Sequence, residues 1–139
     1  MVKRPLVAVS GGFDPVHAGH VRMILEAGEH GDVLVILNSD DWLMRKKGYV
    51  FMPWAERAEI LSAFKGVKEV VSVDDTDGSV CHALRFNKPD MFFNGGDRKP
   101  HNTPENSVCE ELGIKQLFSV GGEKIQSSSE LVKKVLGKK

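Results

Sequence analysis

The amino-acid sequence predicts an α/β fold, in which one parallel sheet carries helices on both faces. Short β-rich runs and longer helical patterns alternate about five times, the order that produces parallel strands joined by helical crossovers. One run, DVLVILN, is continuously apolar, as expected of a strand buried on both faces. The chain has 139 residues without an internal repeat. We therefore expect a Rossmann-like, doubly wound, five-stranded sheet in a single domain that spans residues 1–139.

The first half of the chain contains two strands and two helices in strict alternation. The first strand, residues 5–10, runs into a glycine pair. A helix over residues 19–30 follows, because apolar and small residues recur there at helical spacing before a glycine that suits a C-terminal cap. The second strand covers residues 32–38. Residues 40–52 break the pattern with three successive cations, and Pro53 suits the first position of a helix that continues to residue 64.

The second half of the chain repeats the alternation. The expected elements are a strand at 67–73, a helix at 77–86, a strand at 89–93, a helix that Thr103-Pro104 opens and Gly113 closes, a strand at 114–120 and a helix at 127–136. Ligands of such sheets bind beyond the carboxyl ends of the strands. The loops at that edge are residues 10–20, 38–48, 94–99 and 121–129; three carry glycines with polar groups, and the other carries the cations.

The charge balance excludes one class of partner. There are 19 Lys and Arg residues and 19 Asp and Glu residues, so the formal net charge is zero. Proteins that bind polyanions usually carry a basic excess, because they replace the counterions of the polymer. The sequence therefore argues against nucleic acid and against an anionic membrane surface, but a small anionic ligand needs only a few well-placed cations.

The cysteines and the N-terminus indicate the compartment. Cys81 and Cys109 lie in expected helices and outside any CxxC spacing, which favours reduced thiols over a disulfide framework or a zinc site. The apolar stretch near the N-terminus is five residues long. A signal peptide needs roughly 7–15 and a membrane span nearly 20. We expect a soluble cytoplasmic protein.

The segment GGFDPVHAGH after the first strand has the clearest chemical meaning. His20 falls in the first turn of the expected helix and His17 just before it, so both imidazoles can reach one anion at the helix N-terminus. Gly11 and Gly12 allow backbone amides to approach the same anion. Two other interpretations stay open. The histidines could serve only as loop and capping residues, or they could bind a metal, although no third ligand lies nearby.

The same segment resembles the signature of the cytidylyltransferase-like nucleotidyltransferases, which have HxGH after the first strand. Ser127-Ser128-Ser129 is similar to the late Ser/Thr motif of that family. Further stretches resemble glycerol-3-phosphate cytidylyltransferase and the adenylyltransferase domain of the heptose-phosphate bifunctional enzyme: Asn38-Ser39-Asp40, Lys47-Gly48, Glu56-Arg57 and Gly95-Gly96-Asp97.

The resemblance implies four catalytic residues. His17 and His20 would bind the triphosphate and stabilise charge on the α-phosphate. Lys47, with Lys46 as its substitute, would hold a phosphate, unless these lysines only form a solvated loop. Arg57 would be a phosphate ligand, with a surface ion pair to a neighbouring glutamate as the alternative.

The resemblance also implies a nucleotide site. Asp14 could orient a cation or a loop amide. Mg²⁺ is implied as the cofactor of a triphosphate, without assigned protein ligands. Ser127 could alternatively form a capping box, and Asp97 could be a turn residue. The implied nucleotide-binding residues are Gly11, Gly12, Phe13, Asp14, Gly19, Gly96, Asp97, Ser127, Ser128 and Ser129.

The implied reaction transfers NMP from a nucleoside triphosphate to a small phosphomonoester and releases pyrophosphate. CTP is slightly favoured, with glycerol 3-phosphate or a sugar phosphate as the acceptor. The stretch from Gly121 to Lys124 lacks an arginine that some cytidylyltransferases carry, which leaves ATP and a sugar 1-phosphate as the alternative. A further alternative is a non-catalytic nucleotide-binding domain. A dinucleotide-binding dehydrogenase is set aside, since GxGxxG is missing.

One apolar run suggests self-association. Trp42, Leu43 and Met44 fall in a segment expected to be a loop, where such side chains are costly to expose. They are expected to form an active-site lid or a contact in a homodimer.

Overall fold

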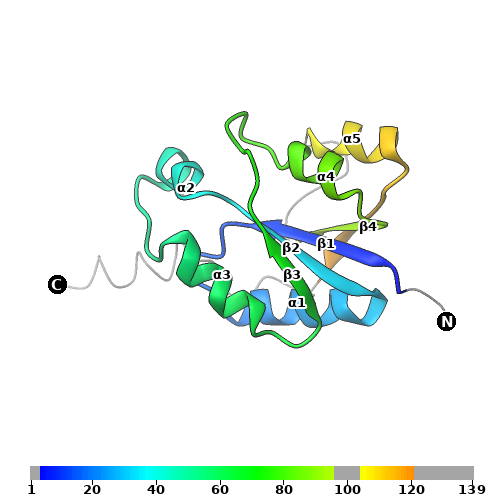
Figure 1. Cartoon of the computed structure of the whole chain (residues 1–139), viewed down its shortest axis with the longest axis horizontal. Coiled ribbons are helices and arrows are strands. Elements are labelled where there is room, and N and C mark those ends of the chain that lie inside the picture. The colour runs from blue at the N-terminus through cyan, green and yellow to red at the C-terminus, as the bar shows by residue number, and fades with distance from the viewer. Residues whose placement is uncertain (1–3, 96–103, 121–139) are drawn as a thin grey trace.

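The computed structural model describes residues 4–95 and 104–120 of the chain. Five parallel strands form one sheet in the order β3-β2-β1-β4-β5 (Figure 1). The chain thus moves outward from β1 in one direction and returns to add β4 on its other side, which confirms the doubly wound α/β class. The strands are β1 (Leu6–Gly11), β2 (Asp32–Leu37), β3 (Val67–Val71), β4 (Met91–Gly95) and β5 (Lys115–Val120).

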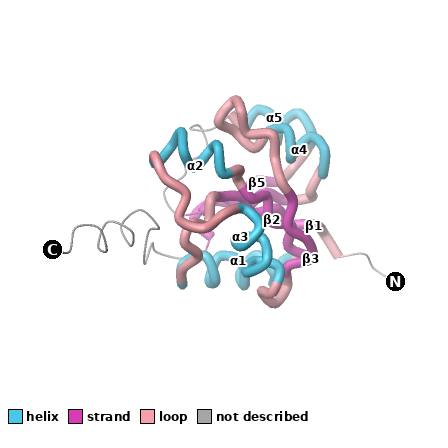
Figure 2. The backbone as a smooth tube through the Cα atoms, turned by 60° about the vertical axis from the view of Figure 1, so that its left-hand side comes forward, coloured by secondary structure: helices cyan, strands magenta, loops and turns pink. Residues whose placement is uncertain are grey.

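Helices cover both faces of this sheet (Figure 2). The helices α1 and α3 pack on one face, α4 and α5 pack on the other, and α2 follows β2 directly at the carboxyl edge. Each strand lies within two residues of its predicted position. The helices of the described residues are α1 (Ala18–His30), α2 (Asp40–Lys47), α3 (Trp54–Ser62), α4 (Cys81–Asn87) and α5 (Glu105–Leu112).

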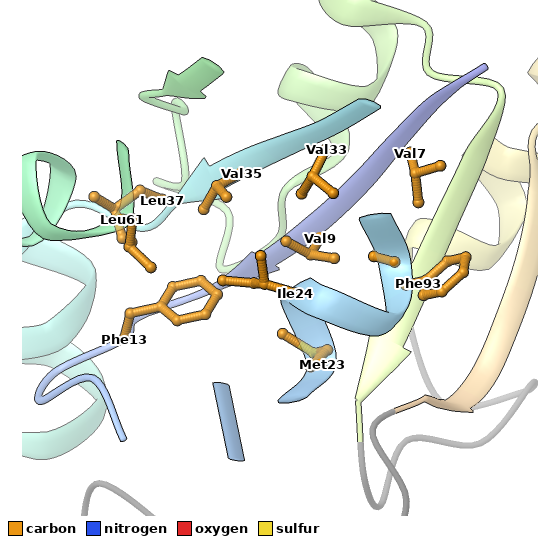
Figure 3. Close-up of a cluster of buried hydrophobic side chains, with 11 residues drawn as sticks. Val7, Val9, Phe13, Met23, Ile24, Val33, Val35, Leu37, Leu61 and Phe93 are labelled. Atoms are coloured by element: carbon orange, nitrogen blue, oxygen red, sulfur yellow. The ribbon is translucent and has the colours of Figure 1, made fainter. Parts of the chain in front are cut away.

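Alternating side chains of the strands divide the core into two layers. In β1, Val7 and Val9 face α1 and α3, while Ala8 between them faces α4 and α5. This follows from the two-residue period of a strand. On the α1 side the ring of Phe13 and the side chain of Ile24 fill the space below the carboxyl ends of the central strands (Figure 3). The core therefore supports the loop that follows β1.

One helix of the structure was not predicted from the sequence. Residues 40–52 were expected to be irregular, but Asp40–Lys47 form α2. The hydroxyl of Ser39 caps its start by accepting a hydrogen bond from the amide of Trp42 at 3.0 Å, and Gly48 ends it in the left-handed conformation with φ 83°. The acids at the start and the bases at the end of α2 complement the helix dipole. The cap residues and the terminal charges can be recognised in the sequence, but the polar composition of the segment favoured a loop.

Two other expected helices, over residues 77–86 and 127–136, are not seen as expected in the described residues. The helix expected from residue 77 begins at Cys81, because the carboxylate of Asp77 accepts hydrogen bonds from the amide and hydroxyl of Ser79 and holds a turn there. The helix expected over residues 127–136 lies outside the described residues. Within residues 4–95 and 104–120, no helix has the length and apolar character needed to cross a membrane.

Candidate active site

His17 and His20 form a reciprocal cap at the start of α1. Nδ1 of His17 accepts a hydrogen bond from the amide of Gly19, and Nδ1 of His20 accepts one from the amide of His17, each at 3.1 Å. The two rings stack with centroids 3.8 Å apart and an interplanar angle of 20°. The capping interpretation of this pair is therefore correct at Nδ1.

The cap fixes the tautomer of both imidazoles. Because Nδ1 accepts a backbone N–H, the proton of each neutral ring resides on Nε2. Burial, with smaller contributions from His17 and Lys47, lowers the pKa of His20 to about 3, so this ring is neutral near pH 7. The pair thus presents Nε2–H donors on fixed rings at a helix N-terminus, where anions bind favourably.

Gly19 is required by the position of the His17 ring. A Cβ atom at residue 19 would lie 3.0 Å from Cε1 and 3.1 Å from Nδ1 of His17, closer than ordinary contacts. A side chain at residue 19 would therefore force the imidazole to shift by a few tenths of an ångström. This gives a physical reason for the glycine of HxGH that is independent of any contact with a nucleotide.

Phe13 supports His20 from the core. Its side chain is 3% exposed and belongs to the cluster that α1 covers. The Phe13 ring meets His20 edge-on at a centroid distance of 4.6 Å. The side chain of Phe13 thus lies in the core and packs against the histidine, and the predicted contact of this residue with a nucleotide stays a prediction.

Asp14 organises the loop between α2 and α3. Its fully buried carboxylate accepts hydrogen bonds from the amides of Phe51 and Met52, both at 2.6 Å. Both oxygens thus contact loop amides, which is the second of the two roles predicted for Asp14. The other role, orientation of a cation, stays a prediction.

Arg57 joins four segments at the carboxyl edge of the sheet. Its side chain is fully buried. The guanidinium donates to the carbonyls of Met52, Gly12 and Asn38 at 2.8, 2.7 and 3.0 Å and to a carboxylate oxygen of Asp40 at 2.6 Å. The predicted surface ion pair with a neighbouring glutamate is wrong, because the partner is Asp40. The phosphate ligand predicted from sequence is, in this structure, a buried brace between loops.

Lys47 approaches the HxGH loop from the end of α2. Its Nζ donates to the carbonyl of Asp14 at 3.4 Å. Burial lowers the pKa of Lys47, and Asp14 partly opposes that effect. Lys46, the predicted substitute, is exposed and lies over the ring of Trp42, with Nζ 5.0 Å from the centroid. Of the two lysines, Lys47 is the one beside the HxGH loop.

The apolar run of α2 packs into the fold. Leu43 is fully buried, and a Cβ atom at Gly12 would lie 2.9 Å from its side chain and 3.3 Å from Trp42. Gly12 is thus required by the close approach of α2. Met44 keeps 51% of its surface exposed. The expectation of an exposed three-residue run is therefore wrong for Leu43, while Met44 is exposed as expected.

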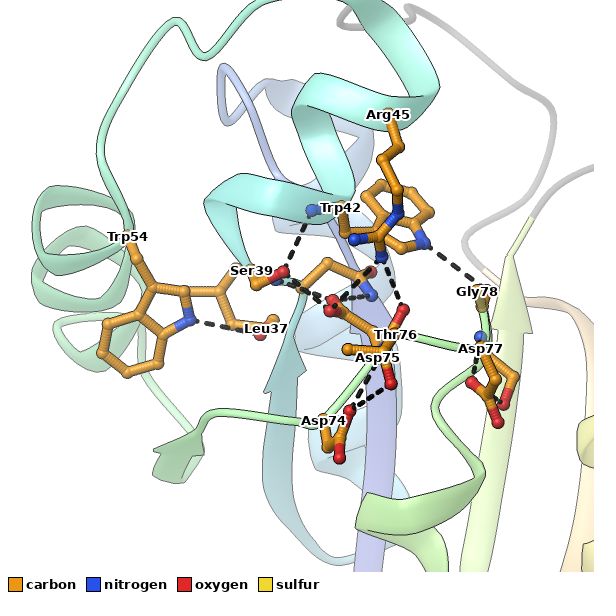
Figure 4. Close-up of polar contacts among 12 residues, drawn as sticks. Leu37, Ser39, Trp42, Arg45, Trp54, Asp74, Asp75, Thr76, Asp77 and Gly78 are labelled. Atoms are coloured by element: carbon orange, nitrogen blue, oxygen red, sulfur yellow. Dashed lines mark hydrogen bonds and ion pairs between the residues drawn. The ribbon is translucent and has the colours of Figure 1, made fainter.

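Sequence reasoning missed a polar network beside α2 (Figure 4). The buried carboxylate of Asp75 accepts hydrogen bonds from Asn38 and Ser39. The side chain of Arg45 donates to the backbone carbonyl of Asp75. The sequence resemblance includes Asn38-Ser39, but a contact with a residue 36 positions away has no local signal.

Five predicted nucleotide-binding residues lie outside the described residues: Gly96, Asp97, Ser127, Ser128 and Ser129.

The described residues do not fit a resident metal ion. Among them, no group of three or more His, Cys, Asp or Glu side chains is placed to hold one. Both oxygens of Asp14, the carboxylate closest to the HxGH loop in sequence, already accept backbone amides.

Comparison with known proteins identifies the family. The model of the cytidylyltransferase-like family matches residues 8–134. Bifunctional protein HldE of Geobacter metallireducens is 34% identical over 139 residues, a match that covers 96% of this chain and 27% of the relative. HldE of Streptomyces coelicolor is 38% identical over 112 residues, covering 78% of this chain and 24% of the relative. The chain thus spans about a quarter of the length of these curated relatives.

Solved structures show the same fold. A lipopolysaccharide core biosynthesis protein from Thermoplasma volcanium has a TM-score of 0.69 at 24% identity, with 86% of this chain and 98% of that chain covered. A bifunctional NMN adenylyltransferase/ADP ribose pyrophosphatase from Francisella tularensis has a TM-score of 0.70 at 14% identity, with 96% and 42% covered. The solved structures share the fold, and the match to the family model shows that the chain belongs to the cytidylyltransferase-like family.

Proposed function

We propose that the chain transfers a nucleoside monophosphate from a nucleoside triphosphate to a small phosphomonoester. The observation that carries this proposal is the capped HxGH pair, which fixes two imidazoles at a helix N-terminus with Nε2 as their donor atom. Lys47 adds a cationic side chain beside the same loop. Such an arrangement suits phosphoryl chemistry, which depends on positioning and on stabilisation of charge.

In the proposed reaction an oxygen of the acceptor phosphate forms a bond to the α-phosphorus. The bond from that phosphorus to the oxygen that bridges to the β-phosphate breaks, and pyrophosphate leaves with the electron pair. His17 and His20 donate hydrogen bonds to phosphate oxygens as charge develops on them. No side chain has to act as a nucleophile or a base, because the acceptor oxygen is already anionic near pH 7.

The magnesium ion belongs, in this proposal, to the substrate. The triphosphate binds as its Mg²⁺ complex, and the described residues contribute no ligand cluster of their own. The residues expected to contact the remaining phosphates and the base are Ser127–Ser129 and Gly96-Asp97, as the sequence resemblance implies.

The relatives support one choice of substrates over the other. The similarity to HldE, together with the sequence resemblance to the heptose-phosphate adenylyltransferase domain, favours ATP and a sugar phosphate. We therefore propose AMP transfer to a sugar 1-phosphate, with CTP and glycerol 3-phosphate as the competing pair. The test incubates the chain with Mg²⁺, ATP or CTP and a panel of phosphomonoesters, and measures pyrophosphate.

The expected result is release of pyrophosphate that requires both a nucleotide and one acceptor. Loss of release in His17→Ala and His20→Ala supports the assigned site. Absence of pyrophosphate with every pair contradicts the proposal, and nucleotide binding by calorimetry without turnover then favours the non-catalytic alternative.

The homodimer and the cytoplasmic location remain proposals. Among the described residues β3 has one neighbouring strand, β2, and an edge strand is a place where a second copy could pair. Sedimentation at two protein concentrations tests the dimer, and a mass equal to one chain at both concentrations contradicts it.

A further inference from the structure

Asp75 is a buried carboxylate outside the predicted site. It lies in the loop between β3 and α4 and is 3% exposed. Its side chain accepts hydrogen bonds from Nδ2 of Asn38 at 3.0 Å and from the amide and hydroxyl of Ser39 at 2.8 and 2.6 Å (Figure 4). Burial of a carboxylate is costly unless it is compensated in this way. All three donors come from the two residues that precede α2.

Ser39 transmits the position of Asp75 to the start of α2. A hydroxyl has one proton, and that of Ser39 is donated to Oδ1 of Asp75. A lone pair of the same oxygen accepts the amide of Trp42 at 3.0 Å, which is the N-terminal cap of the helix. The carboxylate therefore fixes the orientation of the capping group.

The same loop also holds the last turn of α2. Nη2 of Arg45 donates to the carbonyl of Asp75 at 2.7 Å and lies 3.9 Å from its Oδ1. In addition, Nε1 of Trp42 donates to the carbonyl of Gly78 at 3.4 Å. The loop thus contacts α2 at its cap, at its first turn and at its end, two residues before Lys47.

We propose that Asp75 is a positioning residue that sets the place of α2 and thereby holds Lys47 beside the HxGH loop. On the far side α2 rests against Gly12 through Leu43, and Lys47 reaches the carbonyl of Asp14. The helix is therefore clamped between the loop of Asp75 and the HxGH loop. This inference rests on the proposed function, in which Lys47 contacts a phosphate.

A matched pair of variants isolates the role. Asp75→Asn keeps the size of the side chain but removes the charge and one acceptor. Asp77→Asn is the control, because Asp77 is an exposed carboxylate of the same loop whose hydrogen bonds stay within its own turn. We expect kcat/KM for the triphosphate to fall about tenfold in Asp75→Asn and to stay within about twofold in Asp77→Asn. Equal values for the two variants contradict the proposal.

A double-mutant cycle separates positioning from general stability. If Asp75 acts through Lys47, then adding Asp75→Asn to Lys47→Ala lowers kcat/KM little beyond the loss that Lys47→Ala causes alone. If the two defects multiply, Asp75 does not act through Lys47 and the proposal is overturned. If Asp75→Asn fails to fold, Arg45→Met replaces it in the cycle. The Arg45 side chain is 48% exposed, and its loss leaves the hydrogen bonds of the Asp75 carboxylate with Asn38 and Ser39 in place.

A measurement without substrate distinguishes failure of this inference from failure of the proposed function. The pKa of Lys47, which burial lowers, is followed by NMR of the isotope-labelled side chain. We expect Asp75→Asn to raise it toward its ordinary value and Asp77→Asn to leave it unchanged. An unchanged pKa in Asp75→Asn overturns the positioning role, whereas absence of turnover with every substrate of the wild-type chain overturns only the proposed function.

Discussion

His20 accepts the backbone amide of His17 at 3.1 Å while the two rings stack at 3.8 Å. The first residue of the pair is therefore placed by the second, and both by the start of α1. The two nitrogens of each imidazole thus have different roles. Nδ1 accepts the capping hydrogen bond, and Nε2 is the proposed donor to phosphate. Variants that keep one duty and remove the other test the assignment.

The first prediction separates capping from catalysis at His17. Serine is a strong N-cap residue without a donor that reaches as far as Nε2, whereas alanine cannot cap. We expect His17→Ala to lose about 1 kcal/mol of stability and His17→Ser to retain most of it. Both are expected to lose about 10²-fold in kcat, as when a single oxyanion donor is removed. Urea unfolding and pyrophosphate release measure the two effects.

Wild-type turnover in His17→Ser would show that only the cap matters. The control variant is His82→Ala, at an exposed position of α4.

The second prediction compares two glycines of α1. Alanine is favoured over glycine in a helix by roughly 1 kcal/mol. At Gly28 a Cβ atom would meet, among the described residues, only Val33, at 3.9 Å, so we expect Gly28→Ala to stabilise the chain without changing turnover. At Gly19 the added Cβ would force the His17 ring to shift, and we expect turnover to fall at least tenfold. Gly19→Ala with full activity would show that the stacked geometry is not required.

The third prediction concerns the buried carboxylate of Asp14. Asparagine in its place would direct an NH₂ group at a backbone N–H and leave one loop amide unpaired. We expect Asp14→Asn to cost about 1–3 kcal/mol of stability. Asp41→Asn, an exposed change in the first turn of α2, should cost no more than about 1 kcal/mol. Chemical unfolding of both variants checks this; equal losses would contradict the clamp on the loop.

The fourth prediction distinguishes a brace from a phosphate ligand at Arg57. The ammonium of lysine cannot reach the four acceptors that the guanidinium contacts. We expect Arg57→Lys to lower the free energy of unfolding by about 1–3 kcal/mol, since buried acceptors lose their partners. A raised KM at unchanged stability would instead identify Arg57 as a phosphate ligand. Arg22→Lys, at an exposed position of α1, is the control.

The fifth prediction is a pH dependence of stability that His20 causes. The pKa of His20 is about 3 in the folded chain and 6.5 in the unfolded chain, so between these values the unfolded state binds more protons. The stability contribution is complete above pH 6.5 and decreases as the pH falls toward 3. We expect the wild-type chain to lose more stability between pH 7 and pH 4 than His20→Asn does. Urea midpoints at both pH values measure the difference, and equal losses would contradict the lowered pKa.

Local patterns were sufficient for most of the fold. The alternation of apolar runs and helical periods determined the five strands, their common carboxyl edge and the start of α1 at the HxGH segment, because these features follow from side-chain period and helix capping. The pattern failed for α2, whose polar composition resembles a loop although its caps are present.

The amino-acid sequence by itself determined the class of fold, the edge at which the site lies and the histidine pair. Only the tertiary structure decided that Arg57 is a buried brace and that Asp75 holds α2. The physical reason is distance along the chain: Arg57 meets Gly12 across 45 residues, and Asp75 meets Ser39 across 36. Such partners are brought together by the crossovers of the sheet, and no local periodicity records which carbonyl or hydroxyl a buried charge will find.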